Sequence, residues 1–348
     1  MRERDDVDRK DGAAGSALLA RRLADAAEHQ LAQALPSGLY LVATPIGNLA
    51  DITVRALTTL ARADVIYCED TRHSRTLLSH YAISRPLRPY HEHNAERERP
   101  RIAAELAAGR SVALISDAGT PLVSDPGYKL VRHCVEQGHR VVSLPGPSAL
   151  LAALGSAGLP TDTFLFAGFL PPKQGARRAR LAELSQVPAT LIFFEAPTRL
   201  AETLADMAAV LGERESAVAR ELTKLHEEVR RGSPRELGAW AASQTPKGEM
   251  VVMVGPPSPR EITDEEISAR LQPLLEQVSL SEAAKAAADI LGRGVQCERR
   301  QVPRGTSQLL IHAYRQTHCL RLALFRGKPA ECETATTFTL LRTFQDHQ

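Results

Sequence analysis

The sequence predicts an α/β protein whose sheet is largely parallel, and two observations support this. Short apolar segments typical of buried strands recur between residues 38 and 256, and segments with helical periodicity separate them. Strands that alternate with helices in this way usually pair in parallel, because the helix carries the chain back to the start of the next strand. With 348 residues, the chain exceeds a typical single domain. We therefore expect two α/β domains with appendages.

The first half of the chain carries a regular series of strands and helices. The strands are expected at residues 39–43, 65–68, 112–115 and 141–144. The helices between them are expected at residues 52–61, 72–80, 102–108 and 128–137. A charged, Ala-rich segment with a helical stretch over residues 17–35 precedes the series. The sequence thus predicts an N-terminal extension over residues 1–36 and an N-terminal α/β domain over residues 37–160.

The pattern changes near residues 159–162, where a second domain is expected to begin. Its strands are expected at residues 164–169, 190–195, 216–221, 227–232 and 248–254, with a helix at residues 198–211. The Pro-rich residues 256–259 indicate a linker, and two amphipathic helices are expected after it, at residues 264–277 and 281–291. We expect a C-terminal α/β domain over residues 161–256, a small helical appendage over residues 257–292, and an atypical tail over residues 293–348.

Bulk composition excludes several classes of protein. The five cysteines are odd in number and lack CxxC spacing, which argues against a disulfide framework and a zinc site and favours a reducing cytoplasm. The apolar runs are far too short to span a bilayer, and residues 1–10 lack the apolar core of a secretory signal. A net charge of +2 means that any binding to nucleic acid must come from local basic patches.

Four loops that follow predicted strands combine Gly, Pro, Asp, Thr and Ser. They span residues 43–49, 68–72, 116–127 and 144–149, and Ser148 in the last of them is placed to cap the next helix. Open α/β sheets bind ligands at the carboxyl ends of their strands. Each loop alone could be a tight connection, but together they favour a polar ligand cleft. The sequence has no GxxxxGK[ST], and no GxGxxG follows the first strand, which disfavours P-loop and Rossmann sites.

Charged residues at strand ends of the second domain are candidate functional groups. Glu195 ends one strand, and Arg220, Glu221 and Lys224 lie at and after the end of another. They could equally form a salt-bridged surface network. The sequence His91-Glu92-His93 could suggest a metal, but neither its spacing nor its neighbours support one, so no metal site is expected.

Six motifs resemble those of the ribosomal RNA small subunit methyltransferase I family, which belongs to the tetrapyrrole methylase superfamily. They are VATPIGNLADIT at residues 42–53, EDTR at 69–72, SDAGTP at 116–121, LPGPSA at 144–149, FEAPTR at 194–199 and RELTK at 220–224. They occur in order within residues 38–291. The resemblance implies a two-domain tetrapyrrole-methylase-like fold with a cofactor cleft between the domains.

The resemblance also implies a reaction and its cofactor. The expected activity is S-adenosylmethionine-dependent 2′-O-methylation of a cytidine ribose in the decoding region of 16S rRNA. The expected enzyme is a cytoplasmic homodimer that acts on the assembled small subunit, with no DNA or membrane partner. Carried onto this chain, the cofactor-binding residues would be Pro45, Gly47, Asn48, Asp117, Ala118, Gly119, Thr120, Pro145, Ser148, Phe194, Glu195 and Met250. The Asp117 loop would hold the methionine moiety, and the second domain would contact adenine.

A ribose hydroxyl is a poor nucleophile, so a base or a cation near the developing alkoxide would help the reaction. Lys224 and Arg220 are candidate electrostatic stabilisers, and Glu195 and Glu221 are candidate bases or orienting groups. Catalysis by alignment alone stays open.

Basic residues in two segments are candidate RNA contacts, because Arg and Lys neutralise phosphates. They are Arg72, Arg75, Lys173, Arg177 and Arg178, with His73 and Arg180 beside them. The alternative is a solvated helix face.

Two other functions fit the sequence, and the end of the chain departs from the family pattern. The chain could be a tetrapyrrole C-methyltransferase on the same fold, or a catalytically inactive RNA-binding assembly factor. After Gly292 the family's Lys-containing turn and Tyr/Leu helix are replaced by a segment that continues to Gln348. Our hypothesis is a frameshift or a misassigned end beyond Gly292.

Overall fold

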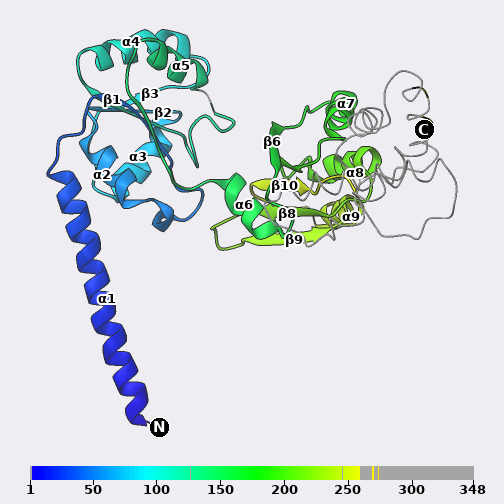
Figure 1. Ribbon diagram of the computed structural model, residues 1–348, viewed down its shortest axis with the longest axis horizontal. Helices are drawn as coiled ribbons and strands as arrows, with labels where there is room; N and C mark the ends of the chain where they lie inside the picture. The colour runs from blue at the N-terminus through cyan, green and yellow to red at the C-terminus, as the bar shows by residue number, and fades with distance from the viewer. Residues whose placement is uncertain (1, 126, 245, 259–268, 270–272, 274–348) are drawn as a thin grey trace, which may run out of the picture. The chain divides into compact units, whose positions relative to one another are not determined.

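The computed structural model describes residues 2–125, 127–244, 246–258, 269 and 273 (Figure 1). Two five-stranded sheets lie in this part of the chain, and both belong to one compact unit that ends at Pro257. Strands and helices are mixed in each half, which confirms the α/β prediction. The helices expected at residues 264–277 and 281–291, and the tail over residues 293–348, lie outside the described residues.

The first sheet is parallel throughout. Its strands are β1 (Gly38–Val42), β2 (Val65–Cys68), β3 (Leu87–Pro89), β4 (Ser111–Ile115) and β5 (Val141–Leu144), in the order β3-β2-β4-β1-β5. The sequence predicts all of these except β3. That strand is short and partly exposed and ends at Pro89, features of a sheet edge that an apolar pattern does not reveal.

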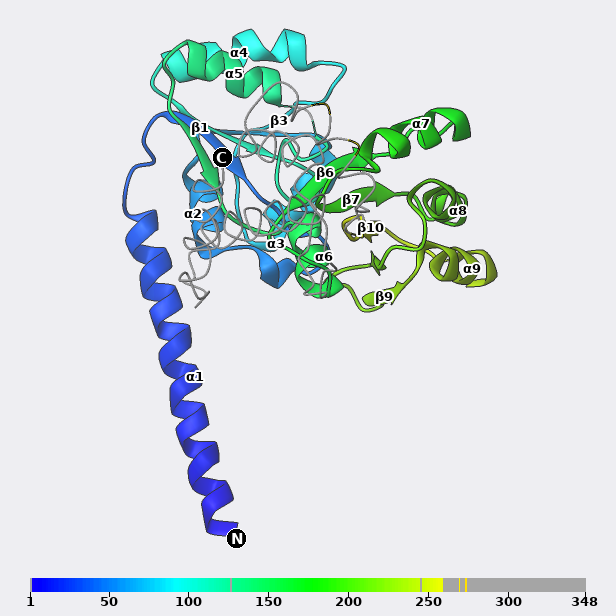
Figure 2. The ribbon, with the colours of Figure 1, turned by 45° about the vertical axis from the view of Figure 1, so that its right-hand side comes forward.

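Helices cover both faces of this sheet, and the alternation of side chains along the strands explains how. Tyr40, Ile66 and Ala113 point to the face that α2 (Val54–Arg62) and α3 (Thr71–His80) cover. The residues next to them, including Leu39 and Val112, point to the face covered by α4 (Ala95–Ala107) and α5 (Tyr128–Glu136). Figure 2 shows the two helix pairs on opposite sides of the strands. Burial on both faces is why these strands are almost entirely apolar.

The N-terminal extension forms the long helix α1 (Arg2–Leu31), which begins well before residue 17, where the sequence predicts its start. Its C-terminal end is attached to α2: Thr58 Oγ1 donates to Gln30 Oε1 over 2.7 Å, and Arg62 Nη1 donates to the carbonyl oxygen of Gln33 over 3.3 Å. A short 3₁₀ turn, η1 (Leu49–Asp51), precedes α2. Thr53 caps α2 by accepting a hydrogen bond from the backbone of Ala56.

The second sheet is mixed. Its strands are β6 (Phe164–Phe169), β7 (Thr190–Glu195), β8 (Ser216–Arg220), β9 (Glu228–Gly232) and β10 (Met250–Val254), in the order β6-β7-β10-β8-β9. Among its pairings only β6 with β7 is parallel. The loop between β8 and β9 is too short to hold a crossover helix, so these strands pair as a hairpin.

Within the described part of the chain, four helices cover the two faces of the second sheet. On one face lie α7 (Gln174–Leu184), α8 (Leu200–Leu211) and α9 (Pro234–Gln244), of which the expected elements include only the helix that corresponds to α8. The other face is covered by α6 (Ala149–Ala157), which directly follows a loop of the first sheet. Ser148 caps α6, as predicted, by accepting a hydrogen bond of 3.4 Å from the backbone of Leu151. This helix carries the chain from the first sheet onto the second.

The sequence predicts no disulfide framework, no membrane span and no metal site, and the structure bears on these predictions only within the described residues. Cys68 and Cys134 are buried and free, and burial raises the pKa of each thiol to about 11. Within the described ranges, no helix is long and apolar enough to cross a membrane. A group of three or more metal-ligating side chains is also absent from the described part of the chain.

Arg177 corrects the sequence prediction of a basic surface at the start of α7. Its side chain is 1 % exposed, and its Nε lies 2.6 Å from Oδ2 of Asp206, which is also buried. Arg178 Nε contacts the other carboxylate oxygen over 2.6 Å. Burial raises the pKa of Asp206, but hydrogen bonds from Arg178 and Arg177 outweigh it and the pKa is lowered. Arg177 is thus an internal ion-pair partner and is not available to RNA.

Replacing Asp206 by Ala is expected to destabilise the protein by about 3–5 kcal/mol, because the Arg177 guanidinium is left buried without its carboxylate. The measurement is the free energy of unfolding in urea. The control is Glu183→Ala, which removes an exposed pair with Arg180 and should cost about 0–1 kcal/mol. Equal losses in the two variants would contradict this account.

Candidate functional site

Hydrogen bonds tie the four predicted loops of the first sheet together at the carboxyl ends of the strands. The backbones of Thr44 and Gly119 exchange two hydrogen bonds, of 2.9 and 3.0 Å. Thr120 Oγ1 donates to the carbonyl oxygen of Pro147 over 3.1 Å. The backbone N–H of Asp70 donates to Asp117 Oδ1 over 3.1 Å. The loops therefore form one connected edge, as their place after parallel strands predicts.

Gly47 lets this edge approach the second sheet closely. A Cβ atom at Gly47 would fall against the Lys224 side chain and lie 2.9 Å from Oγ1 of Thr223. The loop after β1 thus packs directly on the turn after β8. That turn is itself strained, since Glu221 and Thr223 have φ values of 49° and 66°.

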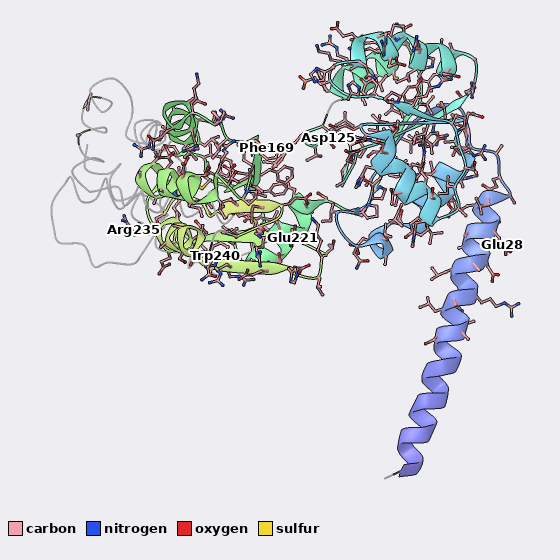
Figure 3. The ribbon with its side chains drawn as sticks, turned by 180° about the vertical axis from the view of Figure 1, so that it is seen from behind. Glu28, Asp125, Phe169, Glu221, Arg235 and Trp240 are labelled. Atoms are coloured by element: carbon pink, nitrogen blue, oxygen red, sulfur yellow. The ribbon has the colours of Figure 1, made fainter. Side chains whose placement is uncertain are left out.

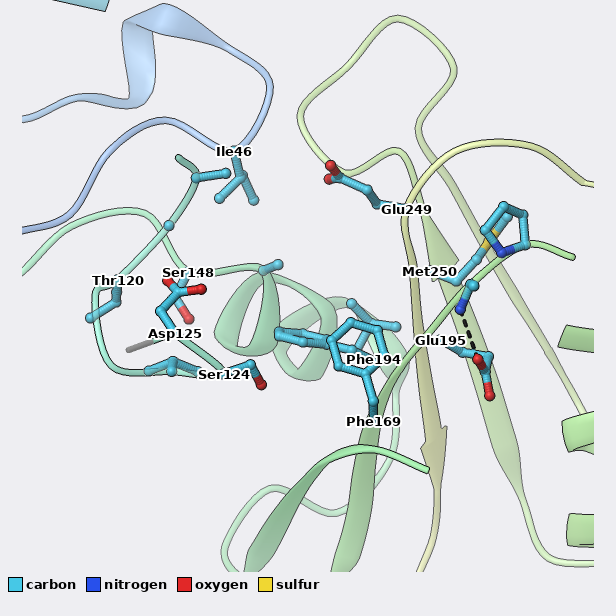
Figure 4. Close-up of a pocket in the computed structure, with 17 residues that line it drawn as sticks. Ile46, Thr120, Ser124, Asp125, Ser148, Phe169, Phe194, Glu195, Glu249 and Met250 are labelled. Atoms are coloured by element: carbon cyan, nitrogen blue, oxygen red, sulfur yellow. Dashed lines mark hydrogen bonds between the residues drawn. The ribbon is translucent and has the colours of Figure 1, made fainter. Parts of the chain in front are cut away.

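A pocket of about 380 Å³ lies beside these loops (Figure 4). Its volume is in the range of small-molecule sites. The first-sheet loops contribute Ile46, Ala118, Gly119, Thr120, Val123, Ser124, Asp125, Ser148 and Ala149. The ends of β6, β7 and β10 and the adjoining loops contribute Phe169, Phe194, Glu195, Ala196, Pro197, Glu249, Met250 and Val251.

Many of the predicted cofactor residues line this pocket. They are Ala118, Gly119, Thr120, Ser148, Phe194, Glu195 and Met250. The others, Pro45, Gly47, Asn48, Asp117 and Pro145, belong to the same loops but are not among the lining residues. Two of those have structural contacts: Asn48 Oδ1 accepts from the backbone of Ala50, and Asp117 accepts from that of Asp70.

Aromatic rings form an apolar wall of the pocket. The ring of Phe194 meets those of Phe166 and Phe169 edge-on, with centroids 4.8 and 5.7 Å apart. Gly168 has a φ of +66°, and the register between β6 and β7 shifts there, so that Phe169 is 58 % exposed at the pocket (Figure 3). A flat apolar group could stack on this wall.

Lys224 is held between two carboxylates beside the pocket. Its Nζ lies 3.0 Å from Glu221 Oε1 and 3.3 Å from Oε2 of Glu249, which lines the pocket. The hydrogen bond from Lys224 lowers the pKa of Glu221. Burial lowers the pKa of Lys224, but the hydrogen bonds to Glu221 and Glu249 and the charges of these two carboxylates together outweigh it, so the pKa is raised. Both groups therefore stay ionised at neutral pH.

Glu195 and Arg220 are each occupied by other partners. The Glu195 side chain is completely buried; one of its oxygens accepts from Thr203 Oγ1 over 2.6 Å and the other from the backbone of Ala196 over 2.8 Å. Arg199 lies 3.4 Å away as its counter-ion. Arg220 Nε donates to Glu228 over 2.8 Å, and Arg220 does not line the pocket. These contacts fix the ends of β7 and β8.

Asp125 is a pocket residue that the sequence analysis missed. It lies in the loop over residues 116–127, where Asp before Pro and Gly indicates only a turn. Burial raises the pKa of Asp125 to about 6, and the nearby Glu69 carboxylate adds to the shift. The available signal was that two acids, Asp117 and Asp125, occur in one strand-end loop.

The remaining predicted RNA contacts lie on the surface. Arg72 pairs with Asp70 at 2.9 Å, yet its side chain is 88 % exposed, and Arg75 on the same helix is also exposed. Lys173 is exposed, and Arg178 is half exposed despite its pair with Asp206.

Comparison with known proteins places the chain in a family. The model of the tetrapyrrole (corrin/porphyrin) methylases matches residues 38–238. A Mesorhizobium japonicum protein named ribosomal RNA small subunit methyltransferase I is 57 % identical over 263 residues, which cover 75 % of this chain and 90 % of that protein. The chain belongs to this methyltransferase family. The resemblance found in the motifs is thereby confirmed.

Two further comparisons concern the sequence and the fold. A Pseudomonas aeruginosa relative of this methyltransferase has the same name and is 49 % identical over 260 residues, covering 73 % of this chain and 92 % of its own. The crystal structure of a diphthine synthase superimposes with a TM-score of 0.50 at 16 % identity, covering 62 % of this chain and 89 % of that one. At this identity the likeness concerns the fold alone.

Gly47→Ala is expected to destabilise the methyltransferase by about 1–3 kcal/mol, because the added methyl group overpacks the contact with Thr223 and Lys224. The measurement is urea unfolding followed by circular dichroism. Gly155→Ala is the control, since this exposed α6 position has nothing within 4 Å of the new Cβ and gains helix propensity. A neutral Gly47→Ala variant would show that the two loops do not pack as described.

Proposed function

We propose that this methyltransferase uses S-adenosylmethionine to methylate the ribose 2′-oxygen of a cytidine in the decoding region of 16S rRNA. The observation that carries the proposal is the match with proteins named ribosomal RNA small subunit methyltransferase I over nine-tenths of their length. Four of the six motifs behind the resemblance, at residues 42–53, 116–121, 144–149 and 194–199, supply most of the residues that line the pocket. By the same resemblance, the enzyme acts as a cytoplasmic homodimer on the assembled small subunit.

The lining of the pocket fits S-adenosylmethionine. The cofactor combines a flat adenine, a hydroxyl-bearing ribose and a cationic methionine moiety. The rings of Phe194 and Phe169 suit the adenine, while Thr120 and Ser148 offer hydroxyl groups and Asp125 offers a carboxylate. Gly119, with a φ of +78°, lets backbone approach a ligand closely. When bound, S-adenosylmethionine supplies an electrophilic methyl group on a sulfonium sulfur.

The protein's residues then have to align the acceptor and exclude water. Alignment of two reactants can supply a large part of a rate enhancement. We assign Glu195 and Arg220 to positioning, because their ion pairs hold the ends of β7 and β8. Lys224 and Glu221 stay candidates for stabilising charge near the acceptor, since their partner Glu249 lines the pocket.

Exposed cations on α3 and at the start of α7 are the proposed RNA contacts. They are Arg72, Arg75, Lys173 and Arg178. Such residues neutralise phosphates and fix the register of the RNA without reading its sequence.

The proposed reaction is tested with tritiated S-adenosylmethionine and small subunits that lack the modification, followed by mapping of the labelled nucleotide. We expect label on the 2′-oxygen of one cytidine ribose in the decoding region. Label on a tetrapyrrole but not on RNA would refute the proposal in favour of a C-methyltransferase. Cofactor binding without label on any acceptor would indicate an inactive assembly factor.

Replacing Arg72 and Arg75 together by Ala is expected to weaken binding to the small subunit, because both side chains are exposed cations. The plot of log Kd against log salt concentration should also become flatter, by about one unit of slope for each phosphate that the protein no longer neutralises. The measurement is the Kd at several salt concentrations. Arg132→Ala, which removes an exposed arginine of α5, is the control and should leave the slope unchanged. Equal slopes for both variants and the wild type would exclude α3 from the RNA surface.

A further inference from the structure

The pocket contains a carboxylate that has no cationic partner among the residues that the structure describes. The carboxylates among its lining residues are those of Asp125, Glu195 and Glu249. Glu195 is paired with Arg199, and Glu249 with Lys224. Asp125 has no ion pair with any described residue. Of the three groups, it is the one whose charge no described cation offsets.

Other acidic groups surround Asp125. Glu69, at the end of β2, and Asp117, on the same loop, both face it. Glu195 and Glu249 line the pocket from the second sheet. A hydrogen bond from Ser116 lowers the pKa of Asp125, but burial and the neighbouring negative charges raise it more. The pKa is therefore about 6. Asp125 is thus more basic than an ordinary aspartate and still largely ionised at neutral pH.

The loop that carries Asp125 is held in an uncommon conformation. Leu122 and Ser124 have φ values of 74° and 66°, which cost free energy for residues other than glycine. Leu122 packs against Gly127. Ser124 Oγ lies close to Gly168, 3.7 Å from the point that a Cβ atom would occupy if Gly168 had a side chain. These contacts hold the loop so that Asp125 lies on the pocket wall with Thr120 and Ser124 (Figure 4).

We propose that Asp125 is the catalytic base of the methyl transfer. This inference rests on the proposed function. The acceptor hydroxyl gives its proton to a carboxylate oxygen of Asp125, and the hydroxyl oxygen uses an electron pair to bond the methyl carbon. The bond between that carbon and sulfur breaks, and its electron pair stays on sulfur. The products are the methyl ether, a neutral thioether and a protonated Asp125, which later releases its proton to water.

The pH dependence follows from this role. A base must be unprotonated to act, so the rate should rise with pH through the pKa of Asp125 and then level off. A cation bound nearby favours the carboxylate and lowers that pKa. The rising limb of the rate at saturating cofactor should therefore lie at or below about pH 6, the pKa without cofactor.

The test compares Asp125→Asn and Asp125→Glu with the wild type. Asp162→Asn is the control, since this exposed carboxyl lies outside the pocket lining. The first measurement is the single-turnover rate of methyl transfer to small subunits at saturating cofactor, as a function of pH. The second is calorimetric binding of S-adenosylmethionine and of S-adenosylhomocysteine without RNA. Thermal unfolding of each variant checks that it folds.

If Asp125 is the base, Asp125→Asn lowers the single-turnover rate by about 100-fold or more and removes the rising limb. Asp125→Glu restores part of the rate, and the rise of the rate with pH occurs at a different pH. The Kd values of S-adenosylmethionine and S-adenosylhomocysteine for Asp125→Asn then stay within about threefold of those for the wild type, a change no larger than the loss of a minor contact.

Two results would overturn the proposal. In the first, S-adenosylmethionine binding weakens strongly while the rate at saturation is kept, which would make Asp125 a counter-ion for the cationic cofactor. In the second, neither rate nor binding changes. A wild-type protein that labels no ribose at all would instead refute the proposed function, and the ratio of the two binding constants would still show whether Asp125 is a counter-ion.

Discussion

The two hydrogen bonds between the backbones of Thr44 and Gly119 determine where the site lies. They close the loop after β1 onto the loop after β4. The hydrogen bond from Thr120 to Pro147 then adds the loop after β5, which leads into α6. Because α6 packs on the second sheet, the same edge of the first sheet is drawn toward β7 and β10. Loops that separately would be mobile connections thus become one wall of a pocket.

The first sheet could be predicted from the sequence because its strands are buried on both faces. A segment such as Val65–Cys68 is apolar throughout, and its length and flanking turns distinguish it from a helix. The order of strands in the second sheet could not be predicted in this way. That order depends on pairings between β10 and its neighbours β7 and β8, which are far apart in the sequence. Helix α9 was missed because its sequence, PRELGAWAASQ, has little apolar periodicity.

Charge roles were the least predictable part of the site, since they depend on partners brought together only by the fold. Arg177 and Arg178 are neighbours in the sequence, and both contact Asp206 of α8, yet one is buried and the other half exposed. Local sequence shows two adjacent arginines and nothing that separates them. Asp125 is a residue that looks ordinary in the sequence and has an unusual acidity in the structure. Its altered acidity arises from burial and from Glu69, a residue of another loop, so the motif alone suggests a turn.

The distribution of charge also explains how a nearly neutral protein can meet two ligands of opposite sign. The chain's net charge is only +2, but acidic groups gather at the pocket around Asp125, while arginines such as Arg72 lie on the exposed face of α3. Under the proposed function, a cationic cofactor enters the acidic pocket and an anionic RNA meets the basic surface. Transfer of the methyl group removes the positive charge from sulfur, so the pocket's electrostatic attraction falls once the reaction is complete. The acidic surroundings of Asp125 would thus favour binding of the charged cofactor over retention of its neutral product.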